Sequence, residues 1–531
     1  MWKHTICAFN LALGFPTVSG SAVEETAFPV AHFRGFQNAV YYTNWGAANY
    51  TAQQLPVSGL THILYAFADI GANGTVISSN PKIDVEQRTA WDPPRANHGR
   101  NAYGVVKQLF IHKQRHRNLK TLLSIGGWAY SPKFAPVAAT ETGRQAFARS
   151  AVKLVTDWGF DGIDVDWEFP DNDKDKENFV KLLEACRVAF DRYSHLHRLR
   201  YRFQITVASP ASAHNYRHMD LAEMNRYVDS WHLMAYDYAG NWSVTSSHQA
   251  NVFANKNITA LNTHDAISHY ESQGISPHKI LMGLPLYGRA FVGTSGLGQK
   301  YSSVGKGGPE PGIWYYKDLP KPGAREEYDD VAKAAYSYDN ATRELISYDN
   351  VRSATFKARY IAGRRLGGAF FWEARGDKTG SQSLLRTMAE NLGWLDATPN
   401  NLHYPTIHTT HRGLKYNTFC YLQANSKMFP AALSLFLQLC LAAFVAAAPI
   451  ADETMAVTKA TPWQYGTGGG IVGFIVLILD IIVFIEVLKS NRPPMNKLIW
   501  CLVVFLFPIV GMIIYFLFSN RKAHNTYESL P

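Results

Sequence analysis

Short apolar runs alternate with longer, more polar stretches between about residues 36 and 405. The apolar runs include residues 61–67, 121–125, 203–208 and 280–284. Runs of this length are typical of buried strands, and the stretches between them are long enough for helices. The pattern therefore predicts an α/β protein that is built from repeated βα units.

One long stretch, at about residues 290–347, interrupts this rhythm. It is rich in glycine, tyrosine and charged residues, and it is too long for an ordinary loop between a strand and a helix. A disordered loop is one interpretation. Disordered segments usually lack aromatic residues, however, and this one contains Trp314, Tyr315, Tyr316, Tyr336 and Tyr338.

The run from Asp161 to Glu168 carries four acids in eight residues and has apolar residues on both sides. If the run is a strand, Asp164, Asp166 and Glu168 share one face, and Asp161 has the other parity. The column of three acids spans about 13 Å and ends at Glu168. Carboxylates this close cannot all ionise, so at least one proton stays in the column near neutral pH. The last acid is then a candidate general acid, with a solvated charge run as the alternative.

The spacing Asp-x-x-Asp-x-Asp-x-Glu resembles the signature of glycoside hydrolase family 18, the chitinases. Six further segments look like motifs of the same family, in the same order: residues 40–45, 63–67, 123–128, 234–238, 286–289 and 367–372. They resemble the first, second, third, sixth, seventh and eighth strand motifs of its barrel. The resemblance covers about residues 36–405 and is strongest to secreted fungal endochitinases.

This resemblance implies an α/β fold, a (β/α)8 TIM barrel with a small α+β insertion between strands 7 and 8. Barrels of this kind carry their chemistry at the C-terminal ends of the strands, and the insertion at about residues 290–347 would form one wall of a deep substrate groove. The implied activity is endo-acting hydrolysis of β-1,4 bonds between N-acetylglucosamine units. Chitin or chito-oligosaccharides would be the partners of a barrel that we expect to be monomeric.

The resemblance also implies a role for each acid. Glu168 would protonate the leaving oxygen and later activate water, while the acetamide of the substrate attacks the anomeric carbon. Asp166 would orient that acetamide and stabilise the positive intermediate, and Asp164 would share a proton with Asp166. Tyr236 would bond the acetyl oxygen. Of the two remaining aspartates, Asp161 would support the strand from below and Asp237 would hold the distorted sugar.

Sugar rings have flat apolar faces that stack on indole and phenol rings, so aromatic side chains near strand ends are candidate substrate contacts. By resemblance, Trp372 is the floor under the sugar at the cleavage point. Core packing is the alternative for aromatic residues of this kind. The further predicted contacts from the same motifs are Trp45, Trp128, Tyr287, Tyr42, Phe67 and Arg289.

Two other functions stay open. A non-catalytic member of the family would bind chitin or another carbohydrate, but such members usually lack the acid at Glu168. An endo-N-acetylglucosaminidase that acts on N-glycans usually carries Asn where this chain has Tyr236. Two departures from the family pattern are the short loop at residues 46–50 and Phe169, where Tyr is common.

Several features bear on the compartment and the partners of the barrel. Residues 1–22 form a weak secretory signal peptide, with a cytosolic start as the alternative, and five sequons suit an extracellular glycoprotein. The part of the chain that resembles the family holds only Cys186, so we expect no disulfide there. The net charge is +10, yet no basic helix or finger motif suits nucleic acid. The histidines show no metal-ligand spacing, so we predict no metal and no other cofactor.

Past residue 405 the sequence changes character. Residues 406–427 form an irregular linker, 428–448 are apolar and read like a second signal peptide, and 521–531 form a tail. Residues 466–520 contain two apolar stretches that are long enough to cross a bilayer, which predicts a hairpin of C-terminal transmembrane helices. This hairpin resembles the domain that precedes the catalytic part of phospholipase D-like proteins such as cardiolipin synthases. Residues 428–531 then belong either to a second gene product merged into this chain or to a membrane anchor of the enzyme.

Overall fold

The computed structural model describes residues 35–88, 92, 102–256, 258–404 and 483. The chain divides into two compact units, Met1–Leu414 and Lys415–Pro531, and the first contains all the described residues except Val483. The predicted signal peptide at 1–22, the linker, the signal-like segment, nearly all of the membrane hairpin and the tail lie outside the described residues. Within the described residues, no helix is long and apolar enough to span a bilayer.

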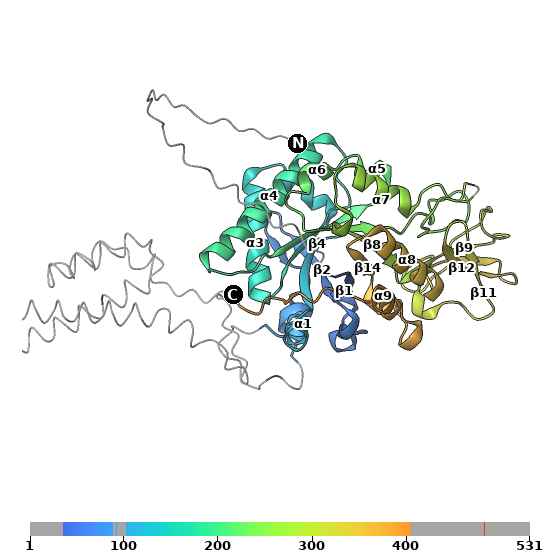
Figure 1. The fold of residues 1–531 in the computed structure, drawn as a ribbon, viewed down its shortest axis with the longest axis horizontal. Coiled ribbons are helices and arrows are strands. Elements are labelled where there is room, and N and C mark those ends of the chain that lie inside the picture. The colour runs from blue at the N-terminus through green and yellow to red at the C-terminus, as the bar shows by residue number, and fades with distance from the viewer. Residues whose placement is uncertain (1–34, 89–91, 93–101, 257, 405–482, 484–531) are drawn as a thin grey trace, which may run out of the picture. The chain divides into compact units, whose positions relative to one another are not determined.

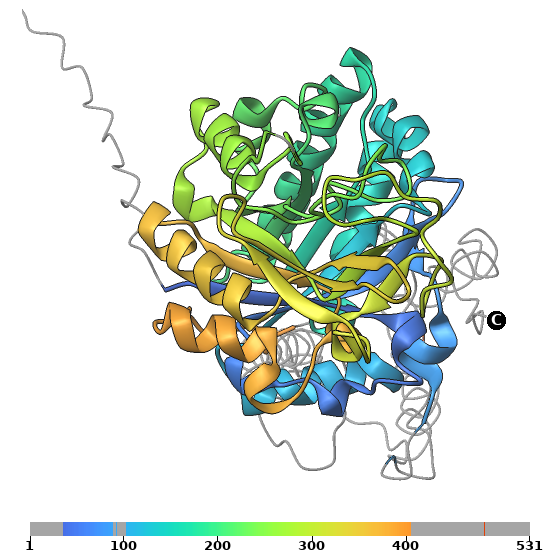
Figure 2. The ribbon, with the colours of Figure 1, turned by 90° about the vertical axis from the view of Figure 1, so that its right-hand side faces the viewer.

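Eight parallel strands form a closed barrel (Figures 1 and 2). β1 pairs with both β2 and β14, and this double pairing closes the sheet. The predicted eight-stranded parallel barrel is therefore confirmed. Its strands are β1 (Gln37–Thr43), β2 (His62–Ile70), β4 (Lys120–Gly126), β5 (Gly162–Asp166), β6 (Gln204–Pro210), β7 (Ser230–Met234), β8 (Ile280–Pro285) and β14 (Gly368–Trp372).

Helices surround the barrel and cover the outer faces of its strands (Figure 1). Local signals set their ends. The hydroxyl of Thr140 accepts from the backbone N–H of Gly143 at the start of α3, and Gly159 ends that helix with φ at 72°. The helices are α1 (Gly104–Arg115), α2 (Phe134–Ala138), α3 (Glu141–Trp158), α4 (Asp173–Leu196), α5 (Ala213–Tyr216), α6 (Leu221–Met224), α7 (Thr263–Ser272), α8 (Val351–Arg364) and α9 (Leu384–Leu392).

The insertion between the seventh and eighth barrel strands folds as an antiparallel sheet at the C-terminal end of the barrel (Figure 2). Its strand order is β10-β9-β13-β12-β11. It folds, as expected, but the described residues between β8 and α8 form strands and a 3-10 turn, with no α-helix, which differs from the predicted α+β composition. The strands are β9 (Tyr287–Val292), β10 (Ile313–Tyr315), β11 (Arg325–Asp329), β12 (Ala334–Asp339) and β13 (Glu344–Ser347).

The predicted position of the seventh strand is wrong. Residues 286–289 were expected to form it, but the barrel strand β8 ends at Pro285, which pairs with Trp372. The backbone N–H of Leu286 then bonds the carbonyl of Trp372, and the chain turns into β9. The insertion therefore starts at Tyr287 rather than at about residue 290.

The core has two parts that are separated by the barrel wall. A small cluster, which includes Ala39, Leu64, Leu122 and Phe370, fills the barrel, and a much larger one lies between the strands and the helices. Side chains along a strand alternate between these two parts. Whether a residue near a strand end can reach the groove above the barrel therefore depends on which of the two faces of the strand it occupies.

Candidate active site

A groove of about 690 Å³ lies over the C-terminal ends of the barrel strands. The loops after β1, β4, β5, β7 and β14 and the first strands of the insertion contribute to its wall. This is where catalysis was expected in a barrel of this type. The predicted site residues that line it are Glu168, Asp166, Tyr236, Asp237, Trp372, Tyr287, Trp45, Trp128 and Arg289.

The acid run forms β5 and the turn after it. Asp164 and Asp166 are buried inside the barrel, and Glu168 follows where the strand ends at the groove floor. The preceding glycine pair makes room for this arrangement. A Cβ on Gly126 would lie 2.3 Å from the backbone oxygen of Asp166, and the N–H of Gly127 donates to that same oxygen over 2.8 Å. The predicted column of acids is therefore present.

Asp164 lies at the bottom of the column and is bonded by hydroxyl groups. The hydroxyls of Tyr41 and Ser124 donate to its Oδ2 over 2.8 and 2.7 Å, and the hydroxyl of Thr206 donates to its Oδ1 over 2.6 Å. Nδ1 of His232 lies 3.3 Å from the same Oδ1. Burial alone would raise the pKa of Asp164, but the His232 contact and the hydroxyl donors outweigh it and lower that pKa.

The two acids above it behave in the opposite way. Burial, followed by the charges of Glu168 and Asp164, raises the pKa of Asp166 well above its usual value. Burial and the charge of Asp237 raise the pKa of Glu168 to about 7. No described residue hydrogen-bonds Oδ1 of Asp166. These directions agree with the predicted retention of a proton in the column, and they leave Glu168 able to act as an acid near neutral pH.

Tyr236 and Asp237 follow the end of β7 and form the wall beside the acids. Burial and nearby phenol and carboxylate groups raise the pKa of Tyr236 well above its usual value, so its hydroxyl remains a donor. Asp237 has φ at 59°, a left-handed conformation that aspartate tolerates. The hydroxyl of Tyr287 and Nε of Arg289 donate to its Oδ1 over 2.6 and 2.5 Å. The insertion thus holds Asp237 in place.

An aromatic stack forms part of the groove. The ring of Phe67 lies between Trp45 and Trp372, with centroid distances of 5.9 and 5.7 Å and interplanar angles of 28° and 22°. Phe67 therefore supports the two tryptophans rather than lining the groove itself. Trp45 and Trp128 are 52% and 75% exposed, which rules out the alternative of core packing for both. Exposed indole faces of this kind suit stacking against sugar rings.

Two predicted site residues lie away from the groove. Asp161 is fully buried just before β5, at its opposite end, where its Oδ2 lies 2.8 Å from Nζ of Lys113. Tyr42 points out of the barrel, donates its hydroxyl to the carbonyl of Tyr50 over 2.7 Å, and stacks on Tyr65. Asp161 thus bonds groups at the base of β5. The predicted contact of Tyr42 with the substrate is wrong, because its side chain is buried outside the barrel.

Several groove residues were missed by the sequence analysis. Trp242 is 57% exposed, and the guanidinium carbon of Arg289 lies 4.6 Å from the centre of its ring. Glu373 follows Trp372 directly, and its Oε1 accepts from Nε of Arg375 over 3.2 Å. These residues lie in loops, where no periodicity marks them. The only available signal was their closeness in sequence to Asp237 and Trp372.

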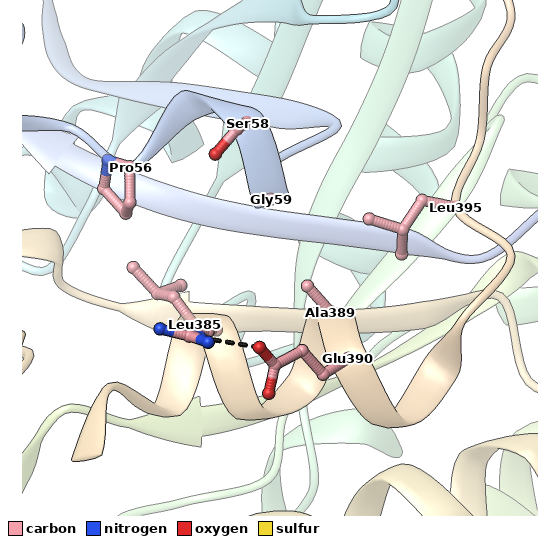
Figure 3. Close-up of a pocket in the computed structure, with 8 residues that line it drawn as sticks. Pro56, Ser58, Gly59, Leu385, Ala389, Glu390 and Leu395 are labelled. Carbon is pink, nitrogen blue, oxygen red and sulfur yellow. Dashed lines mark hydrogen bonds and ion pairs between the residues drawn. The ribbon is translucent and has the colours of Figure 1, made fainter. Parts of the chain in front are cut away.

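A second hollow, of about 460 Å³, lies on the barrel wall (Figure 3). It is bordered by Pro56, Ser58 and Gly59 on one side and by α9 and Leu395 on the other. An ion pair between Arg386 and Glu390 lies along it. Among the residues that the structure describes, no group of three His, Cys, Asp or Glu is arranged to hold a metal ion, here or in the groove.

Comparisons with known proteins agree with this geometry. Residues 37–377 match the family described as glycosyl hydrolases family 18. The chain is 44% identical to chitinase 1 of Aphanocladium album over 399 residues, which cover 74% of this chain and 93% of that protein. It is 46% identical to endochitinase 1 of Metarhizium robertsii over 382 residues, which cover 70% and 89%.

A solved structure gives the same result. The catalytic domain of chitinase B from Arthrobacter superposes with a TM-score of 0.62 at 26% identity, covering 70% of this chain and 98% of that domain. Separately, residues 478–520 match the family described as phospholipase D-nuclease N-terminal. The match at residues 37–377 spans more than half of the chain, and the chain belongs to glycosyl hydrolases family 18.

Proposed function

We propose that this protein is an endo-acting chitinase, which hydrolyses β-1,4 bonds between N-acetylglucosamine units. One observation carries the proposal: a buried column of acids ends at Glu168 on the floor of a groove that is walled by exposed tryptophans. The similarity to fungal proteins named chitinase and endochitinase supports chitin as the substrate.

In the first step, Glu168 donates its proton to the glycosidic oxygen and the bond from that oxygen to the anomeric carbon breaks. The carbonyl oxygen of the substrate's own acetamide forms a bond to the same carbon and gives an oxazolinium ion. Asp166 orients the acetamide and stabilises the positive charge, and the hydroxyl of Tyr236 donates to the acetyl oxygen. Asp237 holds the distorted sugar.

In the second step, the Glu168 carboxylate takes a proton from water, and the resulting oxygen attacks the anomeric carbon. The oxazolinium ring opens, the acetamide is restored, and Glu168 is protonated again. Two displacements on one carbon return the original anomer. The groove supports this scheme because the raised pKa of Glu168, about 7, allows the residue to act as acid and then as base.

The anomer of the first product tests this scheme. We expect proton NMR during cleavage of N-acetylglucosamine hexamer to show the β anomer first, and fully deacetylated chitosan hexamer to resist cleavage. A thiazoline analogue of the intermediate should inhibit strongly, because it resembles the state that the enzyme stabilises. An inverted first product would exclude the acetamide as nucleophile.

We also propose that the barrel acts outside the cell and does not need residues 428–531. The alignment with chitinase 1 of Aphanocladium album supports this, because it covers 93% of that protein with only 74% of this chain. In this proposal the two apolar stretches at 466–520 form a transmembrane hairpin that belongs to a separate gene product. Mass spectrometry of the native protein tests it: peptides spanning residues 420–450 would show a single, membrane-anchored polypeptide instead.

A further inference from the structure

His232 lies inside the barrel, on β7, and is only 1% exposed. Its Nδ1 lies 3.3 Å from Oδ1 of Asp164. Its Nε2 lies 3.4 Å from the hydroxyl of Ser230, and its ring packs against Phe370 with centroids 5.2 Å apart. Nδ1 of His232 is therefore directed at the deepest acid of the catalytic column.

The other groups that contact Asp164 are hydroxyls of Tyr41, Ser124 and Thr206. Of these four contacting side chains, His232 is the one that can carry a positive charge. It lowers the pKa of Asp164, against the effect of burial, whereas the pKa of Asp166 is raised. A single proton shared by the two aspartates thus has its lower-energy position on Asp166.

We propose that His232 is a positioning residue for the reaction, which holds Asp164 ionised so that the shared proton stays on Asp166. Asp166 and Glu168 then meet the substrate as a neutral pair. After Glu168 gives its proton to the leaving oxygen, the two carboxyls share one proton and one negative charge beside the oxazolinium ion. This inference rests on the proposed chitinase mechanism and adds to that mechanism His232, which lies below the acid column.

His232 lies beside an acid, a hydroxyl and an aromatic ring inside the barrel. Its neighbours on β5, β7 and β14 are Asp164, Ser230 and Phe370, and it interacts electrostatically with His62 of β2. Burial, together with the charge of Lys120, lowers the pKa of His62 to about 3, so His62 is neutral at working pH.

Lys120 forms an ion pair with Asp396 in the same barrel. Its Nζ lies 2.9 Å from Oδ2 of Asp396, and the two charges compensate each other at the N-terminal end of the barrel. The neutral ring of His62 bonds the hydroxyl of Thr61 over 2.9 Å and the side-chain oxygen of Gln204 over 3.1 Å. His232 contributes a charge that lowers the pKa of Asp164.

The pH profile of His232→Asn tests this role, with 4-methylumbelliferyl chitobioside as substrate. Loss of the imidazole raises the pH at which Asp164 ionises, so we expect the acid limb of kcat/KM to move to higher pH by about one unit. At a pH on that limb, kcat should fall about tenfold, with KM within about twofold. The matched control is His62→Gln, which replaces another buried histidine of the barrel without a contact to Asp164 and should leave the acid limb in place.

An acid limb that stays in place while the melting temperature falls would show that His232 only fills space, and would overturn the proposal. If His232→Asn does not fold, the wild-type protein with 13C-carboxyl aspartate decides by NMR. We expect the Asp166 carboxyl to stay protonated at pH 7 and the Asp164 carboxyl to stay ionised at pH 4. If these two carboxyls titrate together, the proposal is overturned. This titration needs no turnover, so it separates a failure here from a failure of the chitinase assignment.

Discussion

Asp161 offers a direct separation of stability from chemistry. It carries one of the four acids of the run, yet it lies at the opposite end of β5 from the groove, with its side chain and that of Lys113 both fully buried. Its oxygens also accept from the backbone N–H groups of Thr121 and Asn401 and from the hydroxyl of Tyr201, over 2.8 to 2.9 Å. Asp161 thus joins the start of β5 to the segment that contains Asn401.

Replacing Asp161 by Ala leaves a buried ammonium group without its counter-ion, which costs about 3 to 5 kcal/mol. Burial already lowers the pKa of Lys113 to about 8 with Asp161 present, so part of the cost is relieved when the lysine loses its proton. A barrel of about 370 residues has an unfolding entropy near 0.8 kcal/mol/K, so the melting temperature should fall by roughly 4 to 6 °C.

The assay is thermal unfolding by circular dichroism, together with kcat measured at least 15 °C below the transition, a margin of about three times the expected shift. We expect kcat of folded Asp161→Ala to stay within about twofold of wild type, since the residue contacts no reacting atom. The double variant Asp161→Ala, Lys113→Met should regain part of the lost stability, because it removes the unpaired charge. A large fall in kcat without a fall in melting temperature would refute the assignment of Asp161 to support alone.

Two further predictions concern the groove, and a third concerns the C-terminal region. For Asp237→Asn, the pKa of Glu168 should fall, because a negative neighbour is lost and Arg289 is left unpaired. The basic limb of kcat/KM, expected near pH 7 in wild type, should then move about one pH unit lower. If this limb does not move, Asp237 is not a cause of the raised pKa of Glu168. For Trp242→Ala, KM for chitin hexamer should rise about fivefold with kcat within twofold, since stacking of this kind contributes about 1 kcal/mol; unchanged KM would place Trp242 outside the substrate path. A protein of residues 23–405 should fold and cleave chitin oligomers in a soluble fraction, and an inactive fragment beside an active full chain would show that the C-terminal region is needed.

Much of the fold could be predicted from the sequence because its signals are local. The order of apolar runs indicates βα units, and the alternation of side chains along a strand places Asp164, Asp166 and Glu168 in one column. The C-terminal end of a parallel strand then gives the position of the groove. Each of these inferences needs only the sequence spacing and the geometry of one strand.

The errors have a common physical origin. A strand of a parallel barrel is buried on both faces, so its residues are apolar whichever way they point. Tyr41 and Tyr42 therefore look alike in sequence, although the former bonds Asp164 inside the barrel and the latter bonds Tyr50 outside it. The boundary between β8 and β9 is hidden for a similar reason, since apolar character continues across Pro285.

Residues in loops escaped prediction because their positions depend on tertiary packing. Trp242 reaches the groove through a loop after β7 and packs against Arg289 of the insertion. His232 is one residue of an apolar strand, and its sequence gives no sign that Asp164 lies beside it. Such contacts between strands far apart in sequence are set by barrel closure, which no local pattern records.

The most direct test of the central claim is the turnover of N-acetylglucosamine hexamer by Glu168→Gln. The amide keeps the shape of the side chain but has no acidic proton to give, so we expect kcat to fall at least about 100-fold. Binding of the hexamer, measured by calorimetry, should stay within about fivefold, because the exposed tryptophans and Asp237 are intact. A variant that retains most of its activity would contradict the account, since Glu168 would then not be the acid.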